Sequence, residues 1–311
     1  MLRNVIILVV VLGLLLVIAL IGSIVYVSTE SQRTEGKKGT SEIKTHLEED
    51  SKPEQVYSFL SEAAQSAEDD ANYSGALGLR EEQLELAGRF SKDDKRYLES
   101  LKALAHVQYV DMEDYDGALS NFKKIVEIER KAASGKADGL IDALTKLGDV
   151  ERLLHQTNQA REHLNEAVRL AETSSDMLIK GHAKLCLSAL LLSAGDKELP
   201  SAESAAKESI KCYESAGEKG KSGLEGGADD AYYHLALVED KSGKSKEALE
   251  NFAKALTLSK EAKLEDSQIE ARLQDAGWAE LRAGHKAKAI EYFKRLPEDN
   301  YAAEWCIVNK I

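Results

Sequence analysis

A repeated spacing of large and small apolar residues constrains the fold of this chain more than any other feature. One copy places large, large and small residues in one segment and small, large and small residues in the next: Leu144, Leu147, Gly148, Ala160, Leu164 and Ala167. A second copy keeps the same offsets: Tyr232, Leu235, Ala236, Ala248, Phe252 and Ala255. A third copy keeps them again: Leu273, Ala276, Gly277, Ala289, Phe293 and Leu296. Spacings of three, four and seven residues are typical of one helix face, so each copy predicts two helices joined by a turn.

Three fainter copies extend the pattern toward the N-terminus and into the centre of the chain. The copy around Ala118 needs one extra residue in its first segment, and the copy around Ala76 has Arg80 and Gln83 where a large and a small residue are expected. The copy around Ala202 has a longer turn. The small residues that open the second segments step by 42, 42, 42, 46 and 41 residues: Ala76, Ala118, Ala160, Ala202, Ala248 and Ala289.

This helix-turn-helix pattern resembles the tetratricopeptide repeat family. The resemblance implies an all-α fold, a right-handed superhelical solenoid of about six helix-turn-helix repeats preceded by a single transmembrane helix. The family usually repeats every 34 residues, so the 42-residue step is longer by about two helical turns and is similar to that of kinesin light chain arrays. The family binds other proteins, and we expect the same general role here.

The glycine-rich segment 215–227, SAGEKGKSGLEGG, lies inside the 46-residue step. Its Gly-Lys-Ser element is not a phosphate-binding loop, because Ser215 stands where the first glycine is required and no strand precedes it. We expect an interruption of the solenoid that acts as a flexible joint. The alternative is a mobile basic loop that carries Lys219 and Lys221 to an acidic partner.

The N-terminal segment predicts a membrane anchor. Residues 5–27 form an uncharged run of 23 residues, VIILVVVLGLLLVIALIGSIVYV. As a helix it covers about 34 Å, enough to cross a bilayer, and no cleavage site of the small-x-small type follows it. A cleaved signal peptide is the alternative. Basic residues flank both ends of the run, and we place the repeat domain on the extracytoplasmic side.

Four segments follow from these patterns: a transmembrane anchor at residues 1–28, a flexible polar linker at 29–50, the repeat array at 51–298 and a C-terminal capping helix at 299–311. We expect Trp305 and Ile307 to cover the apolar face of the last repeat. The net charge is −13. Nucleic acid and anionic lipid require a basic surface, so we expect a neutral or basic protein partner, with membrane contact through the N-terminal helix alone.

No pattern in the sequence predicts catalysis, a cofactor, a metal site or a small-molecule substrate, and we do not expect an enzyme. The seven histidines have no metal-binding spacing and are expected on helix surfaces. The three cysteines form no close pair and are expected as small buried thiols. The acidic run from Asp111 lacks the spacing of a calcium loop and predicts an inter-helix turn.

The expected binding surface is the concave groove lined by the first helices. The resemblance places residues just after the signature positions in this groove: Thr145, Asp149, Tyr233, Leu237, Gln274 and Trp278. These positions hold neither lysine nor asparagine, which disfavours a carboxylate-clamp co-chaperone. We predict a protein-binding site on the last two repeats, with Trp278 pointing into the groove: Tyr233, Leu237, Trp278, Leu281 and Arg282. The alternative is that Trp278 packs as core against the preceding repeat.

Two classes of function fit these predictions. The first is a membrane-anchored scaffold that mediates protein interactions and complex assembly. The second is a membrane-tethered chaperone or assembly factor that holds non-native client chains. Recovery of one stoichiometric partner favours the scaffold, and recovery of many substoichiometric clients favours the chaperone.

Retention of the N-terminal run can be tested directly. N-terminal sequencing of the full chain purified from membranes should give a start at or close to Met1, because the run is too long for a signal peptide and lacks a cleavage site. A mature chain that begins near residue 30 would show cleavage instead.

Overall fold

The computed structural model describes these residues: 52–90, 94–132, 137–220, 226–264, 269–297 and 300–303. Within these ranges every regular element is a helix. The predicted membrane anchor, the polar linker, and residues Trp305, Cys306 and Ile307 lie outside the described residues. The chain divides into two compact units, Met1–Asn121 and Phe122–Ile311.

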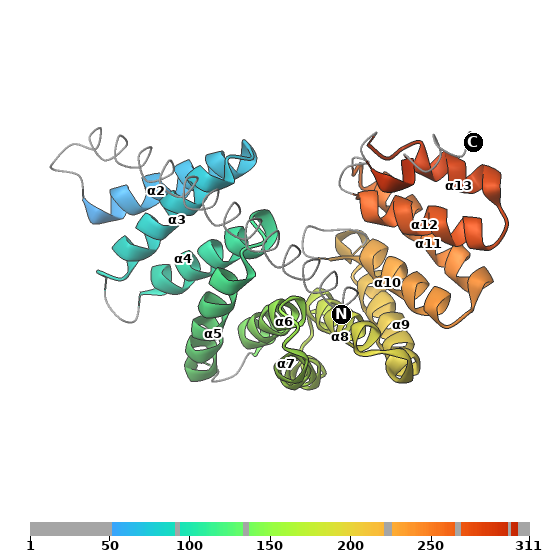
Figure 1. Ribbon diagram of the computed structural model, residues 1–311. Helices are drawn as coiled ribbons and strands as arrows, with labels where there is room; N and C mark the ends of the chain where they lie inside the picture. Colours follow the sequence, from blue (N-terminus) through green and yellow to red (C-terminus); the bar gives the residue numbers. More distant parts are fainter. Residues whose placement is uncertain are drawn as a thin grey trace, which may run out of the picture. The chain divides into compact units, whose positions relative to one another are not determined.

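The first unit contains the helix pair α2 (Pro53–Asp69) and α3 (Tyr73–Ala87), helix α4 (Lys95–His106), the π-helix η1 (Val107–Asp111) and the start of α5 (Tyr115–Ala132), drawn in blue to green in Figure 1. Side chains fix the helix starts: the carboxylate of Asp94 accepts a hydrogen bond from the Arg96 amide at 2.9 Å, and Asn72 accepts one from the Gly75 amide at 3.1 Å. Such caps satisfy amides that have no partner within the helix.

The π-helix accommodates the extra residue that the sequence indicates in the second repeat. The Met112 amide donates to the Val107 carbonyl at 3.0 Å, five residues earlier, so this turn contains one more residue than an α-helical turn. Ala105 before it and Ala118 after it are both 0% exposed. The prediction of an extra residue is confirmed, and the insertion lies in the end of the first helix rather than in the loop.

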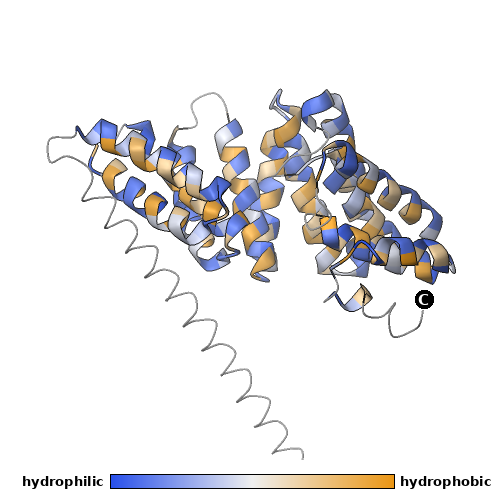
Figure 2. Ribbon diagram, turned by 90° about the horizontal axis from the view of Figure 1, so that it is seen from above, coloured by the Kyte–Doolittle hydropathy of each residue, from blue (hydrophilic) through white to orange (hydrophobic). Residues whose placement is uncertain are grey.

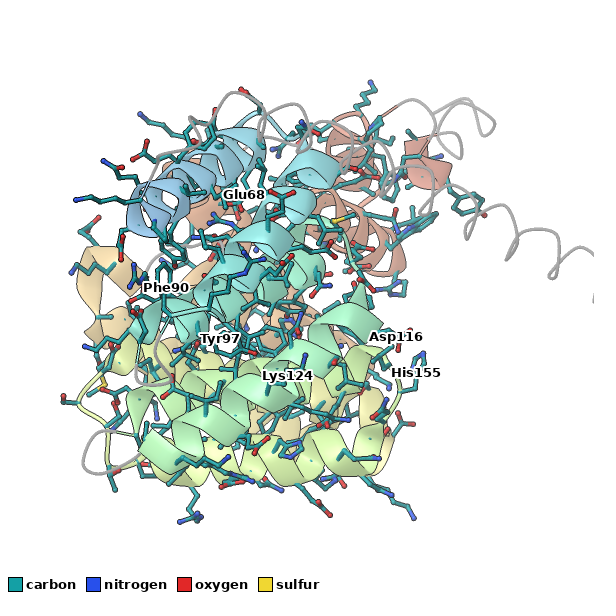
Figure 3. The ribbon with its side chains drawn as sticks, turned by 90° about the vertical axis from the view of Figure 1, so that its left-hand side faces the viewer. Glu68, Phe90, Tyr97, Asp116, Lys124 and His155 are labelled. Carbon is teal, nitrogen blue, oxygen red and sulfur yellow. The ribbon has the colours of Figure 1, made fainter. Side chains whose placement is uncertain are left out.

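The polar residues at two expected core positions of the first repeat are buried and paired. Arg80 and Gln83 are only 6% and 2% exposed. Arg80 Nε donates to Glu68 Oε1 at 2.8 Å, and Arg80 Nη1 donates to Gln83 Oε1 at 3.0 Å. Glu68 projects from α2 toward α3 (Figure 3), so a hydrogen-bonded group replaces the apolar contact of the other repeats.

The second unit continues the same arrangement of helix pairs (Figure 1). Its helices are the rest of α5, α6 (Asp138–Leu153), α7 (Thr157–Ala171), α8 (Met177–Ala194), α9 (Leu199–Ser215), α10 (Ala228–Lys241), α11 (Ser245–Glu261), α12 (Glu270–Arg282) and α13 (Lys286–Phe293). Two 3-10 turns lie between helices: η2 (Asp196–Glu198) and η3 (Gly217–Gly220). Hydrophobic and hydrophilic residues alternate around most helices, so that each has an apolar stripe (Figure 2). We number the helix pairs as repeats 1 to 6, from α2–α3 to α12–α13.

The small residues of the sequence pattern lie at the closest contacts between paired helices. All six alanines that open the second helices are 0% exposed: Ala76, Ala118, Ala160, Ala202, Ala248 and Ala289. A methyl group added at Gly148 would lie 2.6 Å from Leu164 Cγ, and one added at Gly277 would lie 2.3 Å from the Phe293 ring. The predicted helix pairs and the role of their small residues are confirmed.

The turns between paired helices share one backbone feature. A residue with positive φ lies five residues before the opening alanine in five repeats: Ala71, Glu113, His155, Gly243 and Gly284. In the second repeat Asp114 then caps α5 by accepting a hydrogen bond from the Gly117 amide at 3.1 Å. The acidic run from Asp111 therefore ends in the predicted inter-helix turn.

The glycine-rich segment does not interrupt the stack of repeats, and the prediction of an interrupted solenoid is wrong. Helix α10 packs directly on α9 and α8 through a shared apolar cluster that includes Leu185, Ile210, Tyr213 and Leu235. Gly220 is buried against the Tyr213 backbone, where a methyl group would lie 2.0 Å from the Tyr213 carbonyl oxygen. The apolar seam continues across the segment because the first helix of repeat 5 brings its own buried residues to repeat 4.

One described helix, α8, is long and apolar enough to cross a membrane by length and composition alone. Half of its apolar window is buried inside the structure. It contacts α6, α7, α9 and α10, and Leu190 and Ala183 are 0% exposed. These contacts are those of a core helix enclosed by its neighbours.

The close contact at Gly277 predicts a sharp sensitivity to one methyl group. Gly277→Ala should lower the free energy of unfolding by about 1–3 kcal/mol in urea denaturation, because the buried Phe293 ring has no room to move. Gly88→Ala is the control: its methyl group would lie 3.5 Å from the nearest carbonyl at a φ of −64°. That variant should be neutral or stabilised by about 0.4–1 kcal/mol, and equal losses in both would contradict the steric explanation.

Candidate protein-binding surfaces

The five residues predicted to bind a partner lie on the first helices of repeats 5 and 6. Tyr233 and Leu237 belong to α10, and Trp278, Leu281 and Arg282 belong to α12. The four apolar or aromatic residues are partly buried and pack on the core cluster of these repeats. The Arg282 side chain is 57% exposed. The structure thus brings the five residues onto two neighbouring helices, with one charged group reaching solvent.

Trp278 packs toward the C-terminal side of the last repeat. Its ring centroid lies 4.9 Å from that of Phe293 on α13 and 6.3 Å from that of Tyr301. Ala302, in the short helical segment after α13, is 0% exposed and belongs to the same core cluster. The indole therefore contacts its own repeat and the start of the C-terminal segment.

A polar ladder joins α10 to α12 at a constant separation of 42 residues. Tyr233 Oη donates to Asp275 Oδ2 at 2.6 Å, and Arg282 Nη2 lies 2.6 Å from Asp240 Oδ2. Arg272 forms the third rung with Asp230. The step between these two repeats is 41 residues, from Ala248 to Ala289, so each rung joins a residue of α10 to the residue just after its equivalent on α12.

The buried end of this ladder holds more negative than positive charge. Arg272 also donates to Asp229 Oδ2 at 2.9 Å and to the Ser259 hydroxyl. Asp229 is 1% exposed and Arg272 is 9% exposed. Burial raises the pKa of the Asp230 carboxyl, although the neighbouring Arg272 guanidinium opposes this shift. One guanidinium thus holds two carboxylates between repeats 5 and 6.

The corresponding residues of repeat 3 do not face an open groove, and their predicted place there is wrong. Thr145 and Asp149 are 1% and 7% exposed. The Thr145 hydroxyl donates to the Ile141 carbonyl at 2.8 Å, and Asp149 accepts a hydrogen bond from Arg152 Nε at 2.7 Å. Both residues are therefore buried in α6, which packs against α7 and α8.

His234 is an exception to the prediction of histidines on the surface. Its Nδ1 atom is buried and has no hydrogen-bond partner among the described residues. Burial lowers the pKa of the imidazole to about 4, and Arg152 and Arg272 add to this shift. Periodicity places His234 next to the signature position Leu235 but cannot show that the neighbouring first helices cover it.

Grooves on the other side of the second unit were not predicted from the sequence. Each groove lies between two successive second helices, with volumes of about 370 Å³ for α5–α7, 450 Å³ for α7–α9 and 200 Å³ for α9–α11. Equivalent positions line the first two grooves: Lys123 and Val126 in one, Asn165 and Val168 in the other. These positions follow the repeat length of 42 residues, which is the signal that could have identified them.

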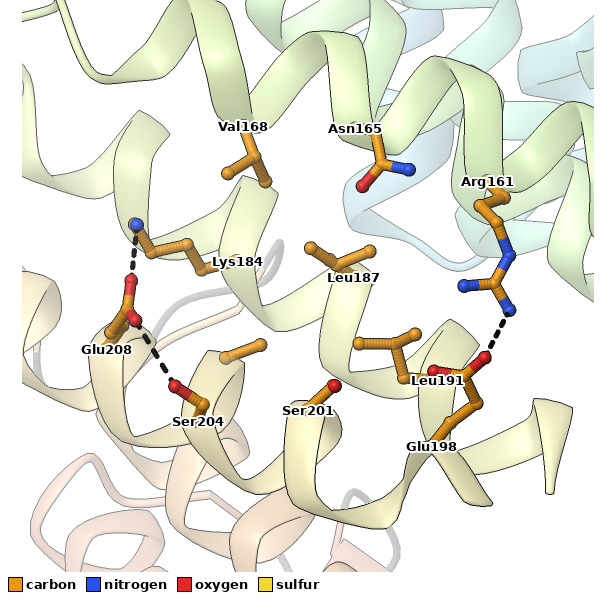
Figure 4. A pocket seen from close by; sticks show the side chains of 11 residues that line it. Arg161, Asn165, Val168, Lys184, Leu187, Leu191, Glu198, Ser201, Ser204 and Glu208 are labelled. Carbon is orange, nitrogen blue, oxygen red and sulfur yellow. Dashed lines mark hydrogen bonds and ion pairs between the residues drawn. The ribbon is translucent and has the colours of Figure 1, made fainter. Parts of the chain in front are cut away.

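The α7–α9 groove has an apolar floor between two ion pairs (Figure 4). Leu187 and Leu191 of α8 form the floor. At one end Lys184 Nζ lies 2.6 Å from Glu208 Oε2, and at the other Arg161 Nη2 lies 3.3 Å from Glu198 Oε1. Burial alone would lower the pKa of Lys184, but hydrogen bonds to Glu172 and Glu208 raise it. The charges at this groove are therefore largely neutralised within the protein.

The helix pairs and their small-residue contacts form a solenoid similar to tetratricopeptide-repeat arrays. Tetratricopeptide repeat family models match residues 108–173, which contain the second helix of repeat 2 and all of repeat 3, and residues 229–261, which correspond to repeat 5. No curated protein matches the sequence significantly. Proteins built from these repeats generally mediate protein–protein interactions and complex assembly.

Solved structures confirm the fold at low sequence identity. The apo form of RapI matches with a TM-score of 0.61 and 12% identity over 84% of this chain and 89% of RapI. A Rap protein in complex with competence and sporulation factor matches with a TM-score of 0.57 and 17% identity over 82% of this chain and 78% of that protein. A putative kinesin light chain from Podosopora anserina, described as having TPR-like repeats, matches with a TM-score of 0.51 and 14% identity over 68% of this chain and 97% of that chain.

The half-buried His234 side chain, with its buried Nδ1 atom, predicts a pH-dependent stability. The pKa of His234 is about 4 in the folded chain against an ordinary value of 6.5, so its stabilising effect is complete above pH 6.5 and is lost as the pH falls toward 4. Wild type should therefore lose about 1–2 kcal/mol more than His234→Leu between pH 6.5 and 4.5, measured by urea denaturation. Parallel stability curves for the two proteins would contradict this role of His234.

Proposed function

We propose that the chain is a membrane-anchored scaffold that binds a protein partner and supports complex assembly at a membrane. The stacked helix pairs with their tetratricopeptide-repeat matches carry this proposal, because such arrays generally bind proteins. The Rap protein of similar fold is in complex with competence and sporulation factor, which is consistent with a binding role for the array. The match is at 17% identity, so the identity of the partner does not follow from it.

Anchoring is proposed from the sequence. Residues 1–28 would span the bilayer, residues 29–50 would form a polar tether, residues 51–298 would form the array and residues 299–311 would cap it. The uncharged run of 23 residues is the basis of the anchor. We propose that the array lies on the extracytoplasmic side of the membrane.

We assign the partner contact to the surface of α10 and α12. Leu237, Leu281 and Trp278 supply apolar area that is only partly covered by the core. Arg282 is exposed beside them, and aromatic residues and arginine are frequent anchors of protein interfaces. With a net charge of −13, the chain as a whole would attract a neutral or basic partner.

Crosslinking from native membranes, followed by mass spectrometry, would identify the partner, and two substitutions would then test the surface. Trp278→Ala should weaken binding of that partner by about 2 kcal/mol or more, about 30-fold. Since Trp278 also packs on Phe293, Arg282→Ala is the cleaner variant. Arg282→Ala should weaken binding while unfolding free energy changes by less than about 1 kcal/mol, the usual range for an exposed ion pair.

Arg89→Ala is the matched control, because Arg89 is also exposed and ion-paired, at 2.5 Å from Glu85. It should leave binding unchanged. Equal binding by wild type, Arg282→Ala and Trp278→Ala would reject this surface. Recovery of many substoichiometric clients in place of one partner would favour the chaperone function.

A further inference from the structure

The three grooves between successive second helices differ in charge. The α7–α9 groove has two cations and two carboxylates in its lining: Arg161, Lys184, Glu198 and Glu208. The α9–α11 groove has one cation and two carboxylates: Lys254, Glu214 and Glu218. The α5–α7 groove has three cations and one carboxylate: Lys123, Arg130, Lys131 and Glu127. Of these three grooves, only the α5–α7 groove has an excess of positive charge in its lining.

The charge difference follows from single substitutions at equivalent positions of the repeat. Arg130 occupies the position that holds Glu172 in the next repeat and Glu214 in the one after. Lys123 occupies the position of Asn165. A basic groove on a chain with a net charge of −13 is therefore a local departure from both the repeat pattern and the overall charge.

The basic residues surround an apolar floor. Val126 of α5 and Leu147 of α6 lie at the bottom of the groove, and most of its exposed lining is apolar. The long side chains of Lys123, Arg130 and Lys131 form much of the rim, where their aliphatic parts extend the apolar surface while their charges reach water. The volume of about 370 Å³ is within the range of small-molecule pockets and leaves room for one bulky side chain.

Not all of these charges are neutralised within the protein. Arg130 pairs with Glu166 across the groove, and Lys131 pairs with Glu127 at 2.7 Å on the same helix. Lys123 is exposed and makes no ion pair with the described residues. The adjacent Lys124, labelled on α5 in Figure 3, is likewise exposed. Charge complementarity therefore favours an occupant with carboxylates near Lys123.

We propose that the α5–α7 groove binds an acidic segment of a partner protein, in which one bulky apolar side chain fills the groove and a neighbouring carboxylate pairs with Lys123. A concave groove with an apolar floor fits one inserted side chain better than the flat layer of headgroups at an anionic membrane surface. This site lies on helices other than α10 and α12, so it goes beyond the partner contact proposed above and can be tested separately.

Selection from a displayed library of random peptides tests this site. The library would be applied to the full chain in detergent, with counter-selection against Lys123→Glu. We expect the recovered peptides to place aspartate or glutamate beside a large apolar residue. A synthetic peptide with a recovered sequence should bind the wild-type chain, and its affinity for Lys123→Glu should be at least tenfold lower. Its affinity for the wild-type chain should fall as the salt concentration rises.

Lys207→Glu is the matched control, because it makes the same change in charge at the equivalent position of α9 and leaves the α5–α7 groove intact. It should retain peptide binding, and so should Arg282→Ala. Circular dichroism melting would confirm that Lys123→Glu remains folded, as expected for an exposed residue without an ion pair. Failure of Arg282→Ala to affect the scaffold's partner would reject the α10–α12 surface and leave this site untouched.

Several results would overturn the proposal. Recovery of no peptide, recovery of peptides without acidic residues, or equal binding to wild type and Lys123→Glu would each reject the site. Equal losses in Lys123→Glu and Lys207→Glu would indicate a general charge effect. Binding of phosphatidylglycerol vesicles that depends on Lys123, in the absence of peptide binding, would assign the basic surface to lipid.

Discussion

The close approach of paired helices at a small residue is the contact on which the rest of the structure depends. The ring of Phe293 occupies the space that any side chain at Gly277 would need, and Leu164 does the same at Gly148. Because each pair is held this tightly, its large residues project toward neighbouring helices and form apolar clusters within each unit, such as the one that joins α8, α9, α10 and α11. This packing decides which residues of each helix face solvent.

Much of the fold could be predicted because the contact leaves a clear trace in the sequence. Small residues at fixed offsets identified the pairs, and even the extra residue before Ala118 was visible as a break in the spacing. The continuity across the glycine-rich segment could not be predicted, because glycine content reports local backbone freedom and not the packing of α10 on α9. The apolar contact between α9 and α10 keeps the two repeats stacked in spite of the glycines between them.

The binding surface was predicted less completely for a related reason. The sequence placed Tyr233 and Trp278 on first helices, but the offsets do not show how far the next helix covers them. Thr145 and Asp149 are covered, whereas Arg282 reaches solvent. The ladder from Asp230 to Arg272 and from Tyr233 to Asp275 depends on the alignment of two helices, and pairs of polar residues 42 positions apart carry no separate signal in one sequence.

The π-turn between Ala105 and Ala118 also has a consequence for how such an array can vary. One inserted residue would rotate the following part of an α-helix by about 100° and turn its apolar stripe away from its neighbours. The wider turn absorbs that rotation within η1, and both flanking alanines keep their buried places. A repeat of this kind can therefore gain one residue without a matching change in the repeats on either side. Its length can change while its buried contacts stay the same.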